Sequence, residues 1–223
     1  MTANNLSLAW NLIPLALLQT LYMVILSGLL AILLGLPLGI ILFLTPRKKI
    51  LYKALSFIVN IGRSFPFAIL MIALIPFTKW IVGTSLGTTA ATIPLAISAA
   101  PFIARLIESS LRAIDPKLLE ASTLMGASSF QLILKILLPE SLPANIQAIT
   151  LTLINLIGYS AMAGLIGGGG LGQVAIQYGY NRFNSTIMYL TVILLILLVE
   201  IVQRIGNHFS FHLLKKRGKT SHA

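Results

Sequence analysis

The 223-residue sequence contains no cysteine, and only 9% of its residues are charged, with five acids in all. The lack of cysteine excludes disulfide frameworks, thiolate metal sites and cysteine nucleophiles. The scarcity of charge excludes an ordinary soluble domain, in which roughly a quarter of the residues are charged. Apolar residues make up 57% of the sequence, and the mean hydropathy is +0.94. Because disordered chains lack apolar content, the composition favours a membrane protein.

The charges that are present are mostly positive, with 16 Lys and Arg residues and a net charge of +11. A nucleic-acid-binding protein needs its basic residues on a face that water reaches. An apolar chain has little such face, so we expect no nucleic-acid partner. The positive charge instead serves as a marker of membrane orientation.

Five apolar stretches are long enough to cross a bilayer, which takes about 20 residues as a helix. They cover residues 14–44, 54–78, 85–107, 142–166 and 184–206. The first must tilt, bend near Pro37 or emerge from the bilayer, and its apolar run is too long for a signal peptide. We expect an all-α integral membrane protein with five transmembrane helices, forming a single domain over residues 1–223 in the lipid bilayer.

Basic residues gather on one side of this arrangement. Thirteen of the 16 lie between spans one and two, between spans three and four, or near the C-terminus: Arg47, Lys48, Lys49, Lys53, Arg105, Arg112, Lys117, Lys135, Arg204, Lys215, Lys216, Arg217 and Lys219. Cytoplasmic connections carry an excess of Lys and Arg. We therefore predict that the N-terminus lies outside and the C-terminus in the cytoplasm, which agrees with an odd number of spans.

The longest connection, residues 108–141, falls on the cytoplasmic side and carries clear helix signals. Asp115 followed by Pro116 is typical of a helix start, and Gly126 is typical of a helix end. One small apolar face of this helix holds Leu118, Ala121, Ser122 and Met125, at i, i+3, i+4 and i+7. Such a face either docks another protein or packs on the chain's own membrane domain.

A second helix is predicted after the glycine. Ser128 and Gln131 fit a capping box, in which each residue satisfies a backbone N–H of the other. Pro139 and Pro143 are expected to end this helix, because proline disrupts a helix interior. The pattern predicts two short helices joined by a glycine turn over residues 115–139, between spans three and four.

A spaced motif runs through this segment: Glu120, Ala121, Ser122, Gly126, Ile136, Leu138 and Pro139. It resembles the signature loop of ABC-importer permease subunits, with one departure at Ser122, where that family usually has alanine. The resemblance implies a coupling helix that seats in a groove of a separate ATPase subunit, with Glu120, Ala121 and Gly126 meeting that partner. Ile136, Leu138 and Pro139 would hold the helix against the membrane domain.

The sequence has no Gly-x-x-x-x-Gly-Lys-Ser/Thr phosphate loop, and no arrangement of carboxylates or of Ser, His and Asp argues for an enzyme. We therefore expect no catalytic residue, no bound cofactor and no ATPase activity in this chain. ATP and Mg would be used by the separate partner subunit.

Three longer segments are similar to the permease subunits of bacterial methionine importers, the MetI type: Asn60–Leu70, Ala99–Leu111 and Ile157–Phe183. The similarity extends from Gln19 to Gln203, with Gln173 at a position where an acidic residue is expected. It implies a multi-pass protein of the bacterial cytoplasmic (inner) membrane. Two copies would assemble with two ATPase subunits and an extracytoplasmic methionine-binding protein. Two further possibilities are an importer of another small amino acid or organic solute, and a membrane scaffold without transport.

Span four contains small and adaptable residues that could line a pathway. Tyr159, Ser160 and Met162 are the candidates, because a hydroxyl can offer a hydrogen bond and a thioether can adapt to a ligand. The alternative is helix packing through small residues, which is common in membranes. Residues 167–172 fit Gly-x-Gly-x-x-Gly, but a dinucleotide site needs a strand before this motif. We expect instead a flexible outer loop that meets the binding protein.

The remaining polar residues in the spans have structural interpretations. Arg63 lies within a predicted span, where a charge raises a functional hypothesis, although its long side chain could extend toward headgroups. Glu200 and Arg204 are spaced to neutralise one another. His208 and His212 have metal-ligand spacing but no evident third ligand, so we expect no metal site.

Overall fold

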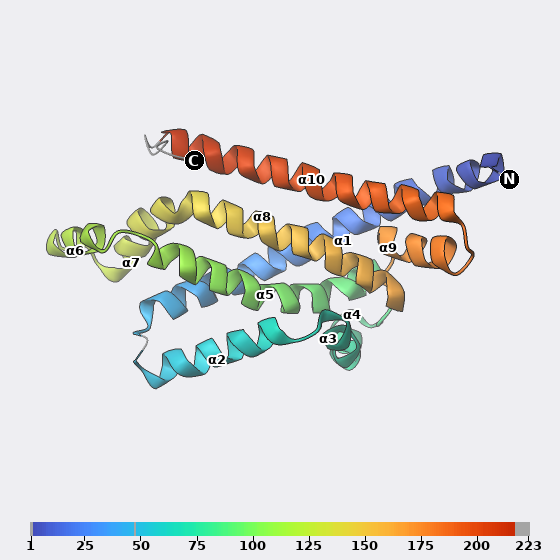
Figure 1. Ribbon diagram of the computed structural model, residues 1–223. Helices are drawn as coiled ribbons and strands as arrows, with labels where there is room; N and C mark the ends of the chain where they lie inside the picture. Colours follow the sequence, from blue (N-terminus) through green and yellow to red (C-terminus); the bar gives the residue numbers. More distant parts are fainter. Residues whose placement is uncertain (1, 47, 217–223) are drawn as a thin grey trace.

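The computed structural model describes residues 2–46 and 48–216, and all elements in these ranges are helical. Arg47, Arg217 and Lys219, which contributed to the predicted orientation, lie outside the described residues. Four long helices run side by side (Figure 1). These are α1 (Thr2–Leu44), α5 (Thr88–Arg112), α8 (Leu138–Ala163) and α10 (Ser185–Lys216).

Shorter helices connect and flank the four long ones. They are α2 (Ile50–Ser64), α3 (Phe67–Ala73), α4 (Ile75–Val82), α6 (Pro116–Leu124), α7 (Ser129–Gln131), the π-helix η1 (Leu132–Leu137), the 3₁₀-helix η2 (Gly164–Ile166), α9 (Gly170–Val174) and the π-helix η3 (Ala175–Tyr180). Helices α6 and α7 lie at one end of the bundle and α9 at the other (Figure 1).

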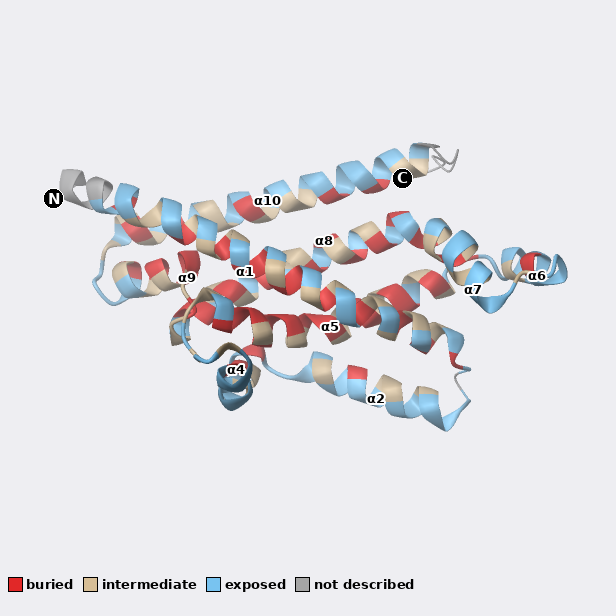
Figure 2. Cartoon of the chain, turned by 180° about the vertical axis from the view of Figure 1, so that it is seen from behind, coloured by how far each residue is buried: buried red, intermediate tan, exposed pale blue. Residues whose placement is uncertain are grey.

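Helix α5 lies at the centre of the fold and is the most buried of the four long helices (Figure 2). It is rich in alanine, so neighbouring backbones approach closely. Gly35 and Gly39 of α1 provide the matching surface, because a Cβ atom at either position would lie 2.7 Å from a carbonyl oxygen of α5, that of Ala100 or Ala104. Only glycine permits this contact, and the crossing of α1 over α5 follows from it.

Four helices in the described ranges are long and apolar enough to cross a membrane, and the bent pair α2–α3 makes a fifth if it counts as one span. Helix α1 is unbroken through Pro14 and Pro37. Its apolar part, Leu8–Leu44, has 37 residues and is about 55 Å long at 1.5 Å per residue. Even at a tilt of about 40° it exceeds a hydrocarbon core of about 30 Å, so part of α1 projects beyond the core.

The stretch expected to form the second span, 54–78, is not one helix. Helix α2 ends at Ser64, and the chain turns by 102° before α3. Phe65 has the extended conformation (φ −71°, ψ 127°), because the ring of the following Pro66 disfavours helical backbone at the preceding residue. With this break before Pro66, the stretch is either a bent span that crosses the membrane or a re-entrant loop that turns back.

The prediction that Pro139 and Pro143 end a helix was wrong. The chain continues helically from α7 through η1 into α8, with Pro139 in the first turn of α8 and Pro143 inside it. In regular α geometry the Pro139 ring would clash with the carbonyl of residue 135. The wider π turns directly before the proline relieve that contact, and the helix passes into the fourth long span.

Candidate functional site

The clearest candidate for a functional surface is the tip formed by α6, its glycine turn and α7. The Asp115 carboxylate accepts a hydrogen bond from the Lys117 N–H at 2.9 Å, and Pro116 occupies the first helical position. At the other end Gly126 has φ +83°. The Ala127 N–H donates to the Ser122 carbonyl at 3.1 Å, which closes the turn in the manner of a Schellman motif. The predicted helix start and stop are confirmed.

The capping box is confirmed as well. The Gln131 N–H donates to the Ser128 hydroxyl at 3.3 Å, and the Ser128 N–H donates to the Gln131 side-chain carbonyl at 3.0 Å. Each helix of the tip therefore begins at a side-chain cap, which fixes its direction independently of any partner. The tip is a pair of capped helices at the end of the bundle (Figure 1).

The predicted docking face is only partly exposed. Leu118, Ala121 and Met125 are exposed, but Ser122 is only 8% exposed. Its hydroxyl donates to the Leu118 carbonyl at 2.6 Å, so a small polar side chain is buried here with its hydrogen bond satisfied. Ser122 therefore faces the fold and not the surface. Of the other motif residues in α6 and its turn, Glu120 and Gly126 are exposed.

Three large apolar side chains at the tip were not identified together from the sequence. Leu124 is 89% exposed, Met125 88% and Phe130 70%. They flank the glycine turn, and Figure 2 shows mostly exposed residues around α6 and α7 at this end of the molecule. Apolar side chains clustered on an exposed element mark an interaction surface. The available signal was apolar residues on both sides of a helix stop, in a connection otherwise expected to be polar.

The base of the tip is anchored by a residue next to those in the motif. Leu137 is 1% exposed and packs in a cluster with Ile107, Leu111 and Ile114. Ile136 and Leu138 on either side of it are half-buried, and Pro139 is exposed. The anchoring expected of this stretch is therefore centred on Leu137, because the π turns of η1 direct that side chain into the core.

The three candidate pathway residues of α8 do not share one face. Ser160 is 1% exposed, and its hydroxyl donates to the Ile157 carbonyl at 2.7 Å. The Tyr159 ring stacks on Phe67, with ring centroids 4.6 Å apart. Met162 is 47% exposed. Tyr159 is half-buried, so of the three residues only Met162 is largely exposed.

An exposed stripe runs along one side of α8 and continues into η2: Leu151, Asn155, Gly158, Met162 and Leu165. The alternating spacing of four and three residues places these positions on one face. At Gly158 an added Cβ would meet nothing within 4 Å. A groove of about 310 Å³ between α8 and α10 adjoins it and is lined by Gly158, Ala161 and Glu200 among others.

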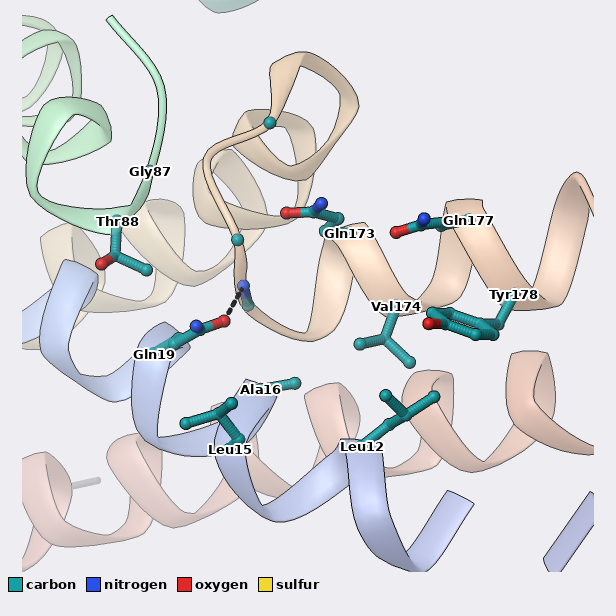
Figure 3. Close-up of a pocket in the computed structure, with 13 residues that line it drawn as sticks. Leu12, Leu15, Ala16, Gln19, Gly87, Thr88, Gln173, Val174, Gln177 and Tyr178 are labelled. Atoms are coloured by element: carbon teal, nitrogen blue, oxygen red, sulfur yellow. Dashed lines mark hydrogen bonds between the residues drawn. The ribbon is translucent and has the colours of Figure 1, made fainter. Parts of the chain in front are cut away.

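A second open site lies at the opposite end of the bundle from the tip. It is a pocket of about 360 Å³ with polar side chains from Gln19, Gln173, Gln177 and Tyr178. Figure 3 shows the glutamines of α9 and η3 across the pocket from Gln19. Arg182 stacks on the Tyr178 ring at 4.4 Å. Apolar side chains, among them Leu12, Leu15 and Val174, also line the pocket, and none of its lining side chains carries a formal charge.

The glycine loop before α9 forms one wall of this pocket and is held by the fold. The Gly170 N–H donates to the Gln19 side-chain carbonyl at 2.9 Å (Figure 3), and the Leu171 N–H donates to the Thr20 hydroxyl at 2.9 Å. These bonds fix the end of the loop where α9 begins, and the expected contact of a flexible outer loop with a binding protein stays a prediction. Within residues 2–46 and 48–216 no strand precedes the loop, so the context of a dinucleotide site is missing there.

The other polar candidates have local partners. The Arg204 guanidinium pairs with the Glu200 carboxylate at 2.7 Å, as predicted. Arg63 lies in the last turn of α2, with its guanidinium 5.8 Å from the centre of the Phe102 ring. The rings of His208 and His212 stack with centroids 6.5 Å apart.

The chain is a bundle of long apolar helices with a capped helical tip at one end and a pocket at the other, an arrangement typical of an integral membrane protein. Residues 31–213 match the family model described as "binding-protein-dependent transport system inner membrane component". The chain therefore belongs to this family of inner-membrane permeases, which is a transporter class and not an enzyme class.

Named relatives fall within the same class. The chain is 54% identical over 194 residues to the probable D-methionine transport system permease protein MetI of Vibrio cholerae, covering 85% of this chain and 86% of that protein. It is 49% identical over 206 residues to the protein of the same name from Pasteurella multocida, covering 90% and 95%. A solved structure of the inward-facing MetNI methionine ABC transporter aligns with a TM-score of 0.88 at 46% identity, covering 91% of this chain and 96% of that one.

Proposed function

We propose that this chain is the permease subunit of an ATP-driven methionine importer in the bacterial cytoplasmic membrane. The observation that carries the proposal is the preformed tip, with Leu124, Met125 and Phe130 exposed around a tight glycine turn. Such a surface is built to be covered by a partner. The identity to D-methionine permeases over most of the chain supplies the substrate.

The tip is the proposed docking site for the ATPase. Basic residues at this end of the bundle, among them Lys117 on the tip and Lys135 in the adjoining η1, support a cytoplasmic location. An outside N-terminus and a cytoplasmic C-terminus follow from that orientation. ATP and Mg would be bound by two ATPase subunits, and a short rigid lever can pass their closure to the spans.

Two copies of the chain form the proposed pathway. The stripe of α8 from Leu151 to Leu165 is uncovered in one copy, and a two-fold interface would place two such stripes against each other. Met162 supplies a soft apolar contact near one end of the stripe, and Gly158 leaves room beside it. The pocket at the outer end, lined by Gln19 and Gln173, faces the side from which an extracytoplasmic methionine-binding protein would approach.

The test is uptake of radiolabelled methionine into vesicles that contain the complete complex and ATP. Gly126→Val strains the left-handed backbone at the tip, whereas Gly83→Val strains a glycine of the same φ, +83°, at the end of α4. An added Cβ at either position would meet no neighbour within 4 Å. We expect Gly126→Val to lose ATPase binding and uptake, and Gly83→Val to retain ATPase binding.

The outcomes separate the competing functions. Efficient competition by another amino acid, with little methionine uptake, would favour an importer of a different small solute. A complex that binds the ATPase but takes up no solute would favour the membrane scaffold. Unchanged ATPase binding by Gly126→Val would remove the tip as the docking site.

A further inference from the structure

A buried carboxylate lies near the cytoplasmic end of α5, close to the tip. Glu108 is 2% exposed. It accepts hydrogen bonds from Arg105 Nη1 at 2.6 Å, from Arg112 Nε at 2.8 Å and from the Tyr52 hydroxyl at 2.9 Å. Burying a charge is costly unless it is paired and hydrogen-bonded. Three donors, two of them cationic, satisfy this one.

The network extends from α5 to one face of α2. Arg105 Nη2 donates to the Ser56 hydroxyl at 2.7 Å and to the Asn60 side-chain carbonyl at 2.8 Å. Tyr52, Ser56 and Asn60 are spaced by four residues, so all three lie on the face of α2 toward α5. We call the set the α2–α5 clasp, which consists of Tyr52, Ser56, Asn60, Arg105, Glu108 and Arg112.

Arg112 joins the end of α1 to the same clasp. Its Nη2 donates to the Leu42 carbonyl at 3.1 Å, in the last turn of α1. Its guanidinium also lies 5.7 Å from the centre of the Phe43 ring and 5.5 Å from that of Tyr52. Arg112 is the last residue of α5, and α6 begins at Pro116. The clasp therefore ends four residues before α6, the first helix of the tip.

Helix α2 has little else to hold it. Val59 is its only buried residue in the described structure, and Figure 2 shows the helix lying on the outside of the bundle. Near its far end Gly62 contacts Pro101, where an added Cβ would lie 2.6 Å from the proline ring. Since α2 buries so little apolar surface, the hydrogen bonds of the clasp carry much of its attachment to α5.

We propose that the α2–α5 clasp makes α2 move with the tip, so that a displacement of α6 by the ATPase reaches the bent span α2–α3. The inference rests on the proposed function for the origin of that displacement. Tyr52, Asn60, Arg105, Glu108 and Arg112 are positioning residues in this step. Without the clasp, α5 moves while α2 lags behind, and ATP is hydrolysed without a matching movement of the pathway.

The test variant is Tyr52→Phe with Asn60→Ala, which removes contacts from α2 while both Arg–Glu pairs of α5 remain. No buried charge loses its counter-ion. The matched control is Tyr189→Phe with Asn207→Ala on α10, where Tyr189 is 68% exposed and Asn207 is exposed. In the reconstituted complex we expect the test variant to hydrolyse at least five times more ATP per methionine transported, and the control to match the original protein.

A conservative exchange provides the rescue. Tyr52→Phe with Asn60→Asp retains an acceptor for Arg105, and we expect it to recover at least half of the coupling. If the Ala variant instead loses ATPase binding, or unfolds at a temperature at least 5 °C lower than the control, the clasp serves stability and the proposal is overturned. An unchanged ratio of ATP to methionine also overturns it.

A second measurement does not depend on methionine. Because the sequence has no cysteine, spin labels can be placed at Phe57→Cys on α2 and Ser109→Cys on α5, both exposed positions. In a complex in which only one copy carries the two labels, we expect one narrow distance distribution, with and without bound ATP. We expect a distribution at least twice as wide in the Ala variant. Equal widths would refute the clasp. Failure of the original complex to transport methionine would contradict the proposed function alone.

Discussion

The exposed tip gives a quantitative prediction for Leu124. This side chain is 89% exposed in the free chain, so nearly all of its apolar surface is available to a partner. Full burial of a leucine side chain contributes about 1.5–3 kcal/mol. If the ATPase covers Leu124, replacement by glutamine removes about 2 kcal/mol per tip. That corresponds to roughly 30-fold weaker binding for each tip.

Glutamine is chosen because its helix propensity is close to that of leucine, so the end of α6 is retained. The assay is titration of the purified ATPase subunit onto the detergent-solubilised permease. The control is Leu86→Gln, at an apolar position that is 63% exposed between α4 and α5 and remote from the tip. We expect the thermal unfolding midpoint of the permease to be unchanged in both variants.

Two results would refute this reasoning. A Leu124→Gln variant that binds the ATPase within twofold of the original affinity would show that the partner leaves Leu124 uncovered. An equal loss of affinity in Leu86→Gln would show that the effect is not local to the tip. In either case the exposure of Leu124 would need another explanation.

Two further predictions concern the core and the pathway. Gly39→Val should destabilise the chain by about 2 kcal/mol through overpacking and lower the thermal unfolding midpoint by about 5 °C. Gly158→Val should leave the midpoint unchanged, because an added Cβ there has no neighbour within 4 Å. Equal midpoints in the two variants would contradict the close contact between α1 and α5. In vesicles, Ser160→Ala should change methionine uptake less than twofold and Met162→Glu should lower it more than tenfold; the reverse order would place the pathway on the other side of α8.

Local features of the fold were predictable because their causes lie within a few residues. The cap at Asp115, the stop at Gly126 and the box of Ser128 with Gln131 depend on side chains that bond their own backbone. The apolar stretches likewise predict long helices, since every backbone group in lipid must be satisfied internally. Sequence spacing also revealed the permease motif around Glu120.

The errors concern the direction in which a side chain points and the path of a helix around a proline. Helical spacing placed Ser122 on the docking face, but the structure turns it inward. Ser160 looked available to a pathway, yet its hydroxyl bonds its own helix. The helix predicted to end at Pro139 continues through π turns. In each case the residue type was informative, but its direction depended on packing.

The sequence by itself determined that the chain is a helical membrane protein with a capped helix pair between two apolar spans, because composition and short-range hydrogen bonding suffice for that. Only the tertiary structure decided which face of each helix is buried and which charges meet. Glu108 and Tyr52 are separated by 56 residues, and Arg105 and Asn60 by 45. No local periodicity pairs them, because their contact exists only once α2 lies along α5.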